Sequence, residues 1–311
     1  MNKIIVTGAT GQIGSELVLE LRKKYGNQQV VAVGHSKQIT GELSNGPYVS
    51  VDVTDKNALS ELVKKYQPDT IFHLVGILSA TGEKNPDLAW NINMGGLKNI
   101  LDIALECGVK KIFWPSSIAA FGPTTPRDNT PQKTILEPTT IYGVTKVAGE
   151  LLCQYYWKKY GLDIRSLRYP GLISYKTPPG GGTTDYAVAI YFEAIKNKKY
   201  TFFVKPETIL PMMYMPDAVR ATIELMESPI ENIKIRTSYN LTAMSFSVKE
   251  LAQTVANHVV GFTCDYNPDD RQKIADSWPR SIDDSSARTD WKWNHFFDLE
   301  KMTIDMLKNI K

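Results

Sequence analysis

Tyr142 and Lys146 stand four residues apart in a segment that we expect to be helical, Ile141–Tyr160. On a helix, two residues at this spacing project from one face, about a turn apart. A tyrosine hydroxyl has a pKa of about 10 in water, and a nearby ammonium group favours its phenolate form. Such a pair can take a proton from a substrate hydroxyl. The alternative interpretation is a pair on the surface of a helix.

A second group of residues, near the start of the chain, has glycines at positions 8, 11 and 14. They lie between an apolar run at Lys3–Thr7, which predicts a strand, and a predicted helix at Glu16–Lys24. In such a strand-to-helix turn, backbone N–H groups can face a pyrophosphate. The spacing differs from the usual Gly-x-Gly-x-x-Gly fingerprint. We predict a dinucleotide site here, with Gln12 and Ile13 in it.

The elements that position these residues follow from the alternation of strand-like and helix-like segments. This alternation is typical of a parallel sheet covered on both faces, so the fold class is α/β, a doubly wound parallel Rossmann sheet. Ser116 and Ser117 follow the fifth strand, at the edge of the sheet where ligands bind in such folds. The further predicted strands are Val30–Val33, Tyr48–Val51, Thr70–Leu74, Lys111–Trp114 and Ile164–Tyr169.

The character of the chain changes after Tyr169, where prolines and glycines exclude regular structure. We therefore predict a Rossmann domain at 1–172, rejoined by about 206–230. A smaller α+β substrate-binding region takes 173–205 and 231–311. Two helix caps are also predicted, Asp55 before Asn57–Tyr66 and Asp217 before Ala218–Met226.

The Gly-x-x-Gly-x-x-Gly turn together with Tyr-x-x-x-Lys resembles the extended form of the short-chain dehydrogenase/reductase superfamily. The resemblance implies that Tyr142 is the general base, that Lys146 holds the ribose and lowers the pKa of the tyrosine, and that Ser117, with Ser116 beside it, is the third catalytic residue. Asp52 matches the position that contacts the adenine, although a capping or turn role is the alternative. The full set of expected cofactor contacts is Gly8, Gly11, Gln12, Ile13, Gly14, Lys37, Asp52, Val53, Leu74, Val75, Gly76, Asn93, Tyr142, Lys146, Tyr169, Gly171 and Leu172.

The choice between NAD and NADP rests on the end of the second strand. An acidic residue at that position would hydrogen-bond the adenosine ribose and repel a 2′-phosphate. Here the sequence has Gly34, followed by His35 and Lys37, so the acid is missing. We expect NAD on the family resemblance, and NADP stays open because Lys37 or His35 would favour a phosphate.

Segments in the second half resemble the short-chain type of L-threonine 3-dehydrogenase, among them Arg168–Ile173, Pro178–Ala187, Leu210–Met215 and Arg271–Pro279. The resemblance implies oxidation of L-threonine to 2-amino-3-oxobutanoate with hydride transfer to NAD. The expected substrate contacts, from donors and acceptors that suit a zwitterion, are Ser79, Ser117, Tyr142, Gly180, Thr183, Thr184, Asp185 and Trp278. Capping of a helix at Tyr186–Ile195 is the alternative role for Asp185, and core packing is that for Trp278.

Two other functions stay open, because one fold hosts many activities. A nucleotide-sugar 4-epimerase would use the same tyrosine and lysine, with Arg220, Arg236 and Arg271 lining a basic pocket. A non-catalytic dinucleotide sensor would keep the fold and have no use for a tuned phenol.

Bulk composition excludes several classes of protein. The 36 basic and 33 acidic residues give a net charge of +3, which argues against a nucleic-acid or polybasic membrane protein. Three widely spaced cysteines without a C-x-x-C pair indicate reduced thiols in a cytoplasmic protein and no metal site. No leader or membrane-spanning run is expected. A predicted helix at Trp90–Ala104 contains Gly95 and Gly96, which leaves monomer and homodimer open.

Overall fold

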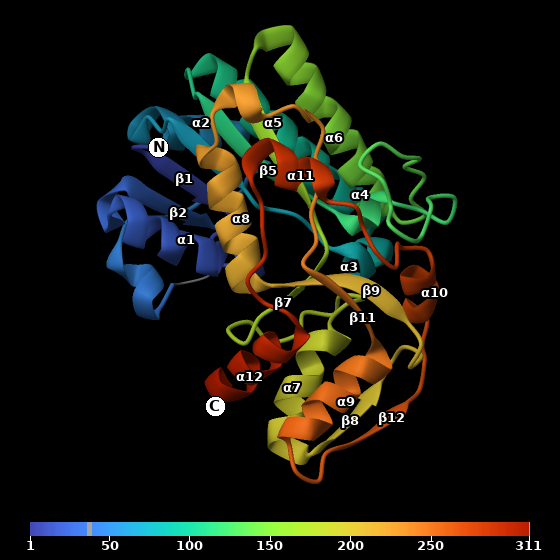
Figure 1. The fold of residues 1–311 in the computed structure, drawn as a ribbon. Coiled ribbons are helices and arrows are strands. Elements are labelled where there is room, and N and C mark those ends of the chain that lie inside the picture. Colours follow the sequence, from blue (N-terminus) through green and yellow to red (C-terminus); the bar gives the residue numbers. More distant parts are fainter. Residues whose placement is uncertain (36–38, 311) are drawn as a thin grey trace.

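The computed structural model describes residues 1–35 and 39–310 of the chain. Within them, seven parallel strands form the main sheet in the order β10-β6-β5-β4-β1-β2-β3 (Figure 1). This order confirms the predicted doubly wound parallel sheet. Its strands are β1 (Ile4–Thr7), β2 (Val30–Gly34), β3 (Tyr48–Ser50), β4 (Thr70–His73), β5 (Lys111–Ser117), β6 (Asp163–Tyr169) and β10 (Tyr239–Asn240).

Helices cover both faces of this sheet. Ile4 and Val6 face one apolar cluster, and Ile5 between them faces another, as the alternation of side chains along a strand requires. Because both faces are buried, β1 and β2 are almost wholly apolar, whereas β6 also buries the charged residues Asp163, Arg165 and Arg168. The first face carries α1 (Gln12–Tyr25), α8 (Met215–Glu227) and α11 (Ser285–Trp291), and the second carries α2 (Lys56–Tyr66), α5 (Gly96–Glu106) and α6 (Ile141–Tyr160).

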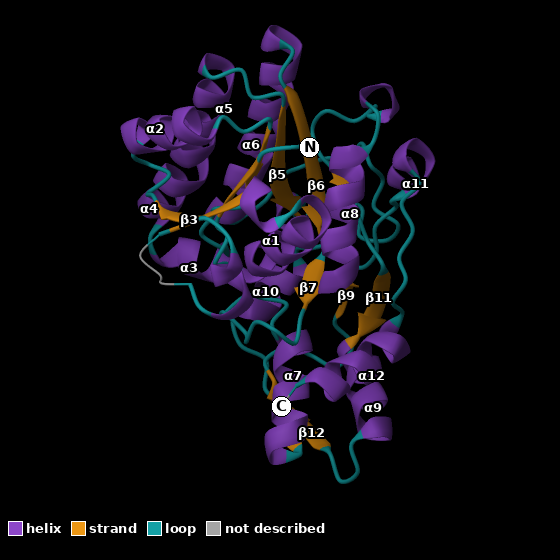
Figure 2. Ribbon diagram, turned by 90° about the vertical axis from the view of Figure 1, so that its left-hand side faces the viewer, coloured by secondary structure: helices purple, strands orange, loops and turns teal. Residues whose placement is uncertain are grey.

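A smaller region lies below the main sheet in Figure 1 and contains the C-terminal helix. It has its own apolar core, and Figure 2 shows it extending away from the carboxyl ends of the main strands. The strands here pair in the orders β11-β9-β7 and β12-β8. Its elements are β7 (Gly171–Ile173), α7 (Tyr186–Asn197), β8 (Lys199–Phe202), β9 (Ile209–Tyr214), β11 (Met244–Ser247), α9 (Val248–His258), β12 (Thr263–Tyr266), α10 (Arg271–Asp276) and α12 (Leu299–Asn309).

Some segments lie in the other region from the one that the sequence predicts for them. β10 pairs with β6 at the edge of the main sheet, and α11 packs beside it, although both lie in the predicted substrate region 231–311. β9 lies in the predicted return to the Rossmann domain but pairs with β7 and β11. A two-residue strand such as β10 is too short to carry a periodic pattern, so its place is set by tertiary pairing.

The predicted helix Trp90–Ala104 is divided in the structure. A π-helical turn, η3 (Asn91–Gly95), separates α4 (Pro86–Trp90) from α5. Gly96 has a packing reason at this point, because a Cβ there would lie 2.9 Å from the Val53 Cγ2 atom. The remaining short helices are η1 (Asn27–Gln29), η2 (Gly41–Asn45), α3 (Ser79–Lys84), η4 (Ile118–Ala120) and η5 (Ile230–Asn232).

The two predicted helix caps have different outcomes. The Asp55 carboxylate accepts hydrogen bonds from the backbone of Asn57 and Ala58, both at 3.0 Å, which confirms it as the cap of α2. Asp217 lies inside the first turn of α8 and does not cap it. Its buried carboxylate instead accepts from the backbone N–H groups of Phe296 and Phe297 and pins the C-terminal segment to α8.

Candidate active site

Helix α6 and the end of β5 bring the predicted catalytic residues together. The Thr140 hydroxyl accepts from the Gly143 backbone at 3.1 Å and fixes the start of α6, one turn of which separates Tyr142 from Lys146. β5 runs three residues beyond its predicted end, to Ser117. Tyr142, Lys146 and Ser117 all line one cavity at the carboxyl edge of the main sheet.

Lys146 is held by the backbone beneath the cavity. Its Nζ atom donates to the Pro115 carbonyl at 2.6 Å and lies 4.6 Å from the centre of the Trp114 ring. The side chain is buried, and burial lowers the pKa of the ammonium group to about 7. Lys146 is therefore only partly charged at neutral pH.

Tyr142 does not have the lowered pKa that its neighbours predict. Burial raises the pKa of the phenol to about 12, and a hydrogen bond with Ser117 opposes this only in part. The Lys146 Nζ atom lies 5.3 Å from the centre of the Tyr142 ring, and it is not among the groups that shift the phenol. Burial disfavours the charged form of both groups, and the lowering of the tyrosine's pKa by Lys146 stays a prediction for the site with its cofactor bound.

Ser116 and Ser117 have separate surroundings although they are adjacent. The Ser117 hydroxyl accepts from the Ala119 backbone at 3.2 Å and faces Tyr142. The Ser116 hydroxyl donates to the buried Glu150 carboxylate at 2.6 Å, and Glu150 forms a two-pronged ion pair with Arg168. Ser116 reaches the cavity wall, but its hydroxyl is committed to this ion pair.

The glycine-rich turn has the geometry of an anion cradle. Gly8 has φ +73°, and a Cβ on Gly14 would lie 2.1 Å from the Gly8 carbonyl oxygen, so the turn can close only with glycine at both positions. α1 starts directly after Gly11, which has no side chain with which to cap it. The N–H groups of its first turn are thus open to a negatively charged group. These features fit the pyrophosphate of a dinucleotide.

A second cavity continues from this turn along the strand ends. It is lined by Thr10, Gly34, His35, Ile92 and seven of the predicted cofactor residues: Gly8, Gly11, Asp52, Val53, Leu74, Val75 and Gly76. The Asp52 carboxylate accepts hydrogen bonds from the backbone and the hydroxyl of Thr54, which is the turn role given as its alternative. Asp52 also lines the cavity. Lys37 lies outside the described residues.

Asn93 lies in the π-helical turn and does not line either cavity within the described part of the chain. Its amide accepts from the Ile77 backbone at 2.7 Å, donates back to the Ile77 carbonyl, and donates to the Thr145 hydroxyl at 3.1 Å. Thr145 in turn donates to the Tyr142 carbonyl. Asn93 therefore ties the strand end after β4 to the helix that carries Tyr142.

His73 is a core residue of the main sheet. It is fully buried, its Nδ1 atom is 2.7 Å from the Thr7 hydroxyl, and burial lowers its pKa to about 3. The imidazole is therefore neutral at neutral pH.

The loop at Gly180–Asp185 borders the cavity from the side of the smaller region. The Asp185 carboxylate accepts from the backbone of Gly181 at 2.7 Å and of Gly182 at 2.8 Å, so it orders this loop and makes no capping bond to α7. Gly182, Thr183, Thr184 and Asp185 line the cavity with Ser79 and Trp278. Gly180 is exposed and is not part of the lining that the structure describes.

Thr183 is a predicted substrate contact with a hydrogen-bonding deficit. It is 1% exposed, and its hydroxyl has no hydrogen-bond partner among the described residues. A buried hydroxyl without a partner costs about 1–3 kcal/mol. Because Thr183 also lines the cavity, this deficit marks a place where a polar ligand group fits.

The remaining walls are mostly apolar. Gln12, Ile13, Tyr169, Gly171 and Leu172 line the cavity as the sequence predicts, and Trp278 both lines it and packs in the smaller core. Sequence reasoning missed Leu78, Ile118 and Pro170, whose only signal is that each adjoins a predicted site residue. The cavity has a volume of about 150 Å³.

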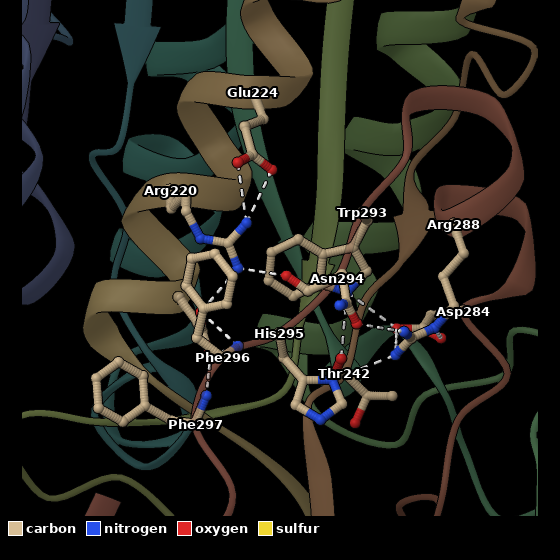
Figure 3. A network of polar contacts seen from close by, with 11 residues as sticks. Arg220, Glu224, Thr242, Asp284, Arg288, Trp293, Asn294, His295, Phe296 and Phe297 are labelled. Carbon is tan, nitrogen blue, oxygen red and sulfur yellow. Dashed lines mark hydrogen bonds and ion pairs between the residues drawn. The ribbon is translucent and has the colours of Figure 1, made fainter. Parts of the chain in front are cut away.

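The three arginines considered for a basic pocket are engaged elsewhere. Figure 3 shows Arg220 between α8 and the C-terminal segment, where its guanidinium stacks on Phe296. Each arginine pairs with carboxylates: Arg220 with Asp217 and Glu224, Arg236 with Asp163, and Arg271 with Asp269. None of the three borders the catalytic cavity in the part of the chain that is described.

The described residues contain no group of three or more His, Cys, Asp or Glu side chains able to hold a metal ion. None of their helices combines the length and the apolar character needed to span a bilayer.

Comparison with known proteins gives the chain a clear set of relatives. The model of the NAD-dependent epimerase/dehydratase family matches residues 4–241. An uncharacterized epimerase/dehydratase of Staphylococcus haemolyticus is 50% identical, over 100% of this chain and 98% of the relative.

Two solved structures are similar over nearly the whole chain. A GalE-like L-threonine dehydrogenase from Cupriavidus necator, in its holo form, has a TM-score of 0.97 at 50% identity, covering 99% of this chain and 100% of the other. The L-threonine dehydrogenase of Clostridium difficile has a TM-score of 0.97 at 51% identity, covering 100% and 98%.

Proposed function

The chain belongs to the NAD-dependent epimerase/dehydratase family, and within it we propose that the protein is an NAD-dependent L-threonine 3-dehydrogenase. The reaction oxidises the β-hydroxyl of L-threonine to a ketone and gives 2-amino-3-oxobutanoate, NADH and a proton. The observation that carries the proposal is similarity at about half of all positions, over the full length, to two L-threonine dehydrogenases.

The cofactor site is assigned to the glycine-rich turn and the strand ends beside it. Gly8, Gly11, Gln12 and Ile13 would hold the pyrophosphate, while Asp52 and Val53 border the adenine end. When bound, NAD⁺ supplies the hydride acceptor. Lys146 would hold the nicotinamide ribose from below, since its Nζ atom is already fixed at the Pro115 carbonyl.

Tyr142 and Ser117 carry the proton chemistry in this proposal. The Ser117 hydroxyl orients the threonine hydroxyl, and the Tyr142 oxygen takes its proton. Burial raises the pKa of the phenol, and the positive charges of Lys146 and of the oxidised nicotinamide would favour its phenolate form. Ser116 is assigned a positioning role, because its hydroxyl is bonded to Glu150.

The substrate pocket suits a small zwitterion. The unpaired Thr183 hydroxyl, with Ser79 and Thr184, offers donors for a carboxylate. A nucleotide-sugar epimerase would need a larger, basic pocket, and the arginines that would line it are paired with carboxylates elsewhere.

The test is the absorbance of reduced nicotinamide with the purified protein and L-threonine, run in parallel with NAD and NADP. We expect turnover with NAD. L-Serine and a UDP-sugar serve as comparison substrates. No turnover of threonine with either cofactor, together with epimerisation of the UDP-sugar, would transfer the assignment to the epimerase. Tight NAD binding without any turnover would favour a sensor.

We also propose that two copies of the chain pair through α4 and α6. Val144, Leu151 and Tyr155 form an exposed apolar stripe at helical spacing on α6, and they are 40%, 58% and 48% exposed. Leu88 and Trp90 on the neighbouring α4 add to it, at 44% and 47%. Light scattering should give the mass of a dimer for the wild type and of a monomer for Leu151→Lys. A monomeric wild type would contradict this proposal.

The cellular location is proposed as cytoplasmic. Cys107, Cys153 and Cys264 are all unpaired thiols. This suits a reducing compartment.

A further inference from the structure

A buried ion pair lies beside the catalytic residues, and neither of its members borders the catalytic cavity in the described part of the chain. Glu150 on α6 is 1% exposed, and Arg168 on β6 is 3% exposed. The Glu150 carboxylate accepts from the Arg168 Nε atom at 2.8 Å and from its Nη2 atom at 2.6 Å. The desolvation of two charges offsets much of the attraction in such a pair, so stability alone is a weak reason for its presence.

Glu150 fastens the strand that leads to Ser117. It follows Lys146 by one helical turn on α6, and both side chains reach the end of β5. The Lys146 Nζ atom donates to the Pro115 carbonyl at 2.6 Å. The Ser116 hydroxyl donates to the Glu150 carboxylate, also at 2.6 Å. Two successive residues of β5 are thus bonded to two successive turns of α6, directly before Ser117.

Arg168 contacts the chain on the other side of Ser117. The central carbon of its guanidinium lies 5.3 Å from the centre of the Phe121 ring, four residues after Ser117. The guanidinium is itself fixed, because it donates to the Asn240 side-chain oxygen at 3.0 Å and to the Gln132 carbonyl at 3.2 Å. The ion pair therefore holds the chain both before and after Ser117.

We propose that Glu150 is a positioning residue for the oxidation, which acts through the Ser116 hydroxyl to fix the place of the Ser117 hydroxyl. Arg168 holds the Glu150 carboxylate in the orientation that this bond requires. The inference rests on the proposed function, in which the Ser117 hydroxyl orients the substrate and Tyr142 takes its proton. Reacting groups must stand about 3–3.5 Å apart, and a misplacement of about 1 Å can cost about 100-fold in rate.

The first measurement is turnover of L-threonine by Ser116→Ala, by Glu150→Gln and by the variant that carries both changes. Ser116→Ala removes only the hydroxyl. A carboxamide at position 150 cannot accept from Ser116 and from both Arg168 nitrogens at once, because it has one oxygen. We expect kcat to fall about 10- to 100-fold in each single variant, with the KM for threonine and the affinity for NAD within about threefold of the wild type. The double variant should be no slower than the slower single variant, because both changes cut the same connection.

The second measurement is amide exchange at Ala119, which needs no substrate. The Ser117 hydroxyl accepts from the Ala119 backbone N–H at 3.2 Å, so exchange of this amide reports whether the hydroxyl keeps its place. We expect exchange at Ala119 to quicken about 10-fold in Ser116→Ala and in Glu150→Gln.

Asp163→Asn is the matched control. Asp163 starts the same strand that carries Arg168 near its end, is 5% exposed, and pairs with Arg165 at 2.8 Å and with Arg236 at 2.7 Å. Like Glu150→Gln, this change weakens a buried ion pair, so a comparable loss of stability is expected. It should leave both kcat and exchange at Ala119 at their wild-type values.

Three results would overturn the inference: wild-type kcat and wild-type Ala119 exchange in Ser116→Ala, losses of the two single variants that multiply in the double variant, or an equal loss of kcat in Asp163→Asn. Ser116→Ala alone decides if Glu150→Gln does not fold. A wild type that does not oxidise threonine refutes the proposed function. In that case faster exchange at Ala119 in Ser116→Ala, but not in Asp163→Asn, still supports the positioning role.

Discussion

Two glycine-rich segments border the site, and their glycines are constrained in different ways. In the turn at Gly8–Gly14 a Cβ on Gly14 would lie 2.1 Å from the Gly8 carbonyl oxygen, so glycine is required by close contact with backbone. In the loop at Gly180–Gly182 no backbone atom opposes a Cβ: Gly180 meets no described atom within 4 Å, Gly181 has φ +95°, and a Cβ on Gly182 would lie 2.9 Å from an Asp185 carboxylate oxygen. The first segment belongs to the main sheet and the helices that support it, which form the scaffold side of the site. The second borders the catalytic cavity together with Tyr142 and Lys146, which form the reaction side.

The hydrogen bonding of polar groups also differs between the two sides. On the scaffold side, Asn93, Thr145 and Asp55 have all their main hydrogen-bond partners within the chain. On the reaction side, the Thr183 hydroxyl lacks a partner among the described residues, and burial disfavours the charge on Lys146. The comparison teaches that these scaffold groups are satisfied within the chain, whereas the pocket leaves the Thr183 hydroxyl for a ligand to satisfy.

The largest effect should come from the reaction side. Tyr142→Phe removes the proposed base, and such groups contribute about 10²–10⁴-fold to turnover. We expect kcat to fall by at least this much, with NAD affinity within about twofold of the wild type, because the scaffold is untouched. Stopped-flow absorbance and calorimetry measure the two quantities. Retained turnover would remove Tyr142 from the mechanism.

The pH dependence of the free energy of unfolding tests whether burial disfavours the charged form of Lys146. Its folded pKa of about 7 lies below its usual 10.5, so between these values the unfolded chain binds more protons and stability rises with pH. Lys146→Met should therefore be more stable than the wild type at pH 6, on the order of a few kcal/mol. The difference should shrink as the pH rises from 7 towards 10. Denaturant unfolding at four pH values checks this, and a difference that does not vary with pH would contradict it.

The glycine contrast itself is tested by a matched pair of substitutions. Gly14→Ala forces a Cβ against immovable backbone and should lower the free energy of unfolding by about 3 kcal/mol, with loss of NAD binding. Gly180→Ala has open space and should change stability by less than about 0.5 kcal/mol. Thermal unfolding with and without NAD measures both. Similar losses in the two variants would erase the proposed difference between the segments.

The sequence predicts the elements of the scaffold side better than the contacts of the reaction side, for physical reasons. Strand periodicity, the Asp55 cap and the glycine turn are local signals, and each is found in the structure. The place of β10, the reason for Gly96 and the ion pair beside Ser117 depend on contacts between distant segments. The burial of Tyr142, which raises the pKa of its phenol, likewise depends on tertiary contacts that its spacing to Lys146 does not reveal.

Two threonines compare a satisfied hydroxyl with an unsatisfied one. Thr145→Val breaks bonds to Asn93 and Tyr142 and should cost about 1–3 kcal/mol of stability. Thr183→Val removes a buried hydroxyl that has no described partner, so the apoprotein should be as stable or more stable. Its KM for threonine should rise about 10-fold or more, since bonds to charged groups are stronger. An unchanged KM would exclude Thr183 from the substrate site.

The smallest effects should come from two aspartates that each accept two backbone N–H bonds, Asp55 before α2 and Asp185 behind the loop. Asp55→Ala removes a helix cap and should lower stability by about 1 kcal/mol without changing the KM for threonine. Asp185→Ala should cost a similar amount of stability, because it also removes two bonds to backbone N–H groups, and it frees the backbone beside Thr183. We expect the KM for threonine to rise about 3- to 10-fold and amide exchange at Gly181 and Gly182 to quicken by a similar factor. If threonine and NAD slow exchange in this loop in the wild type but not in Asp185→Ala, the carboxylate is what holds the loop closed over the substrate. Equal slowing in both would show that the loop closes without it, and the contrast with Asp55 would then be one of location only.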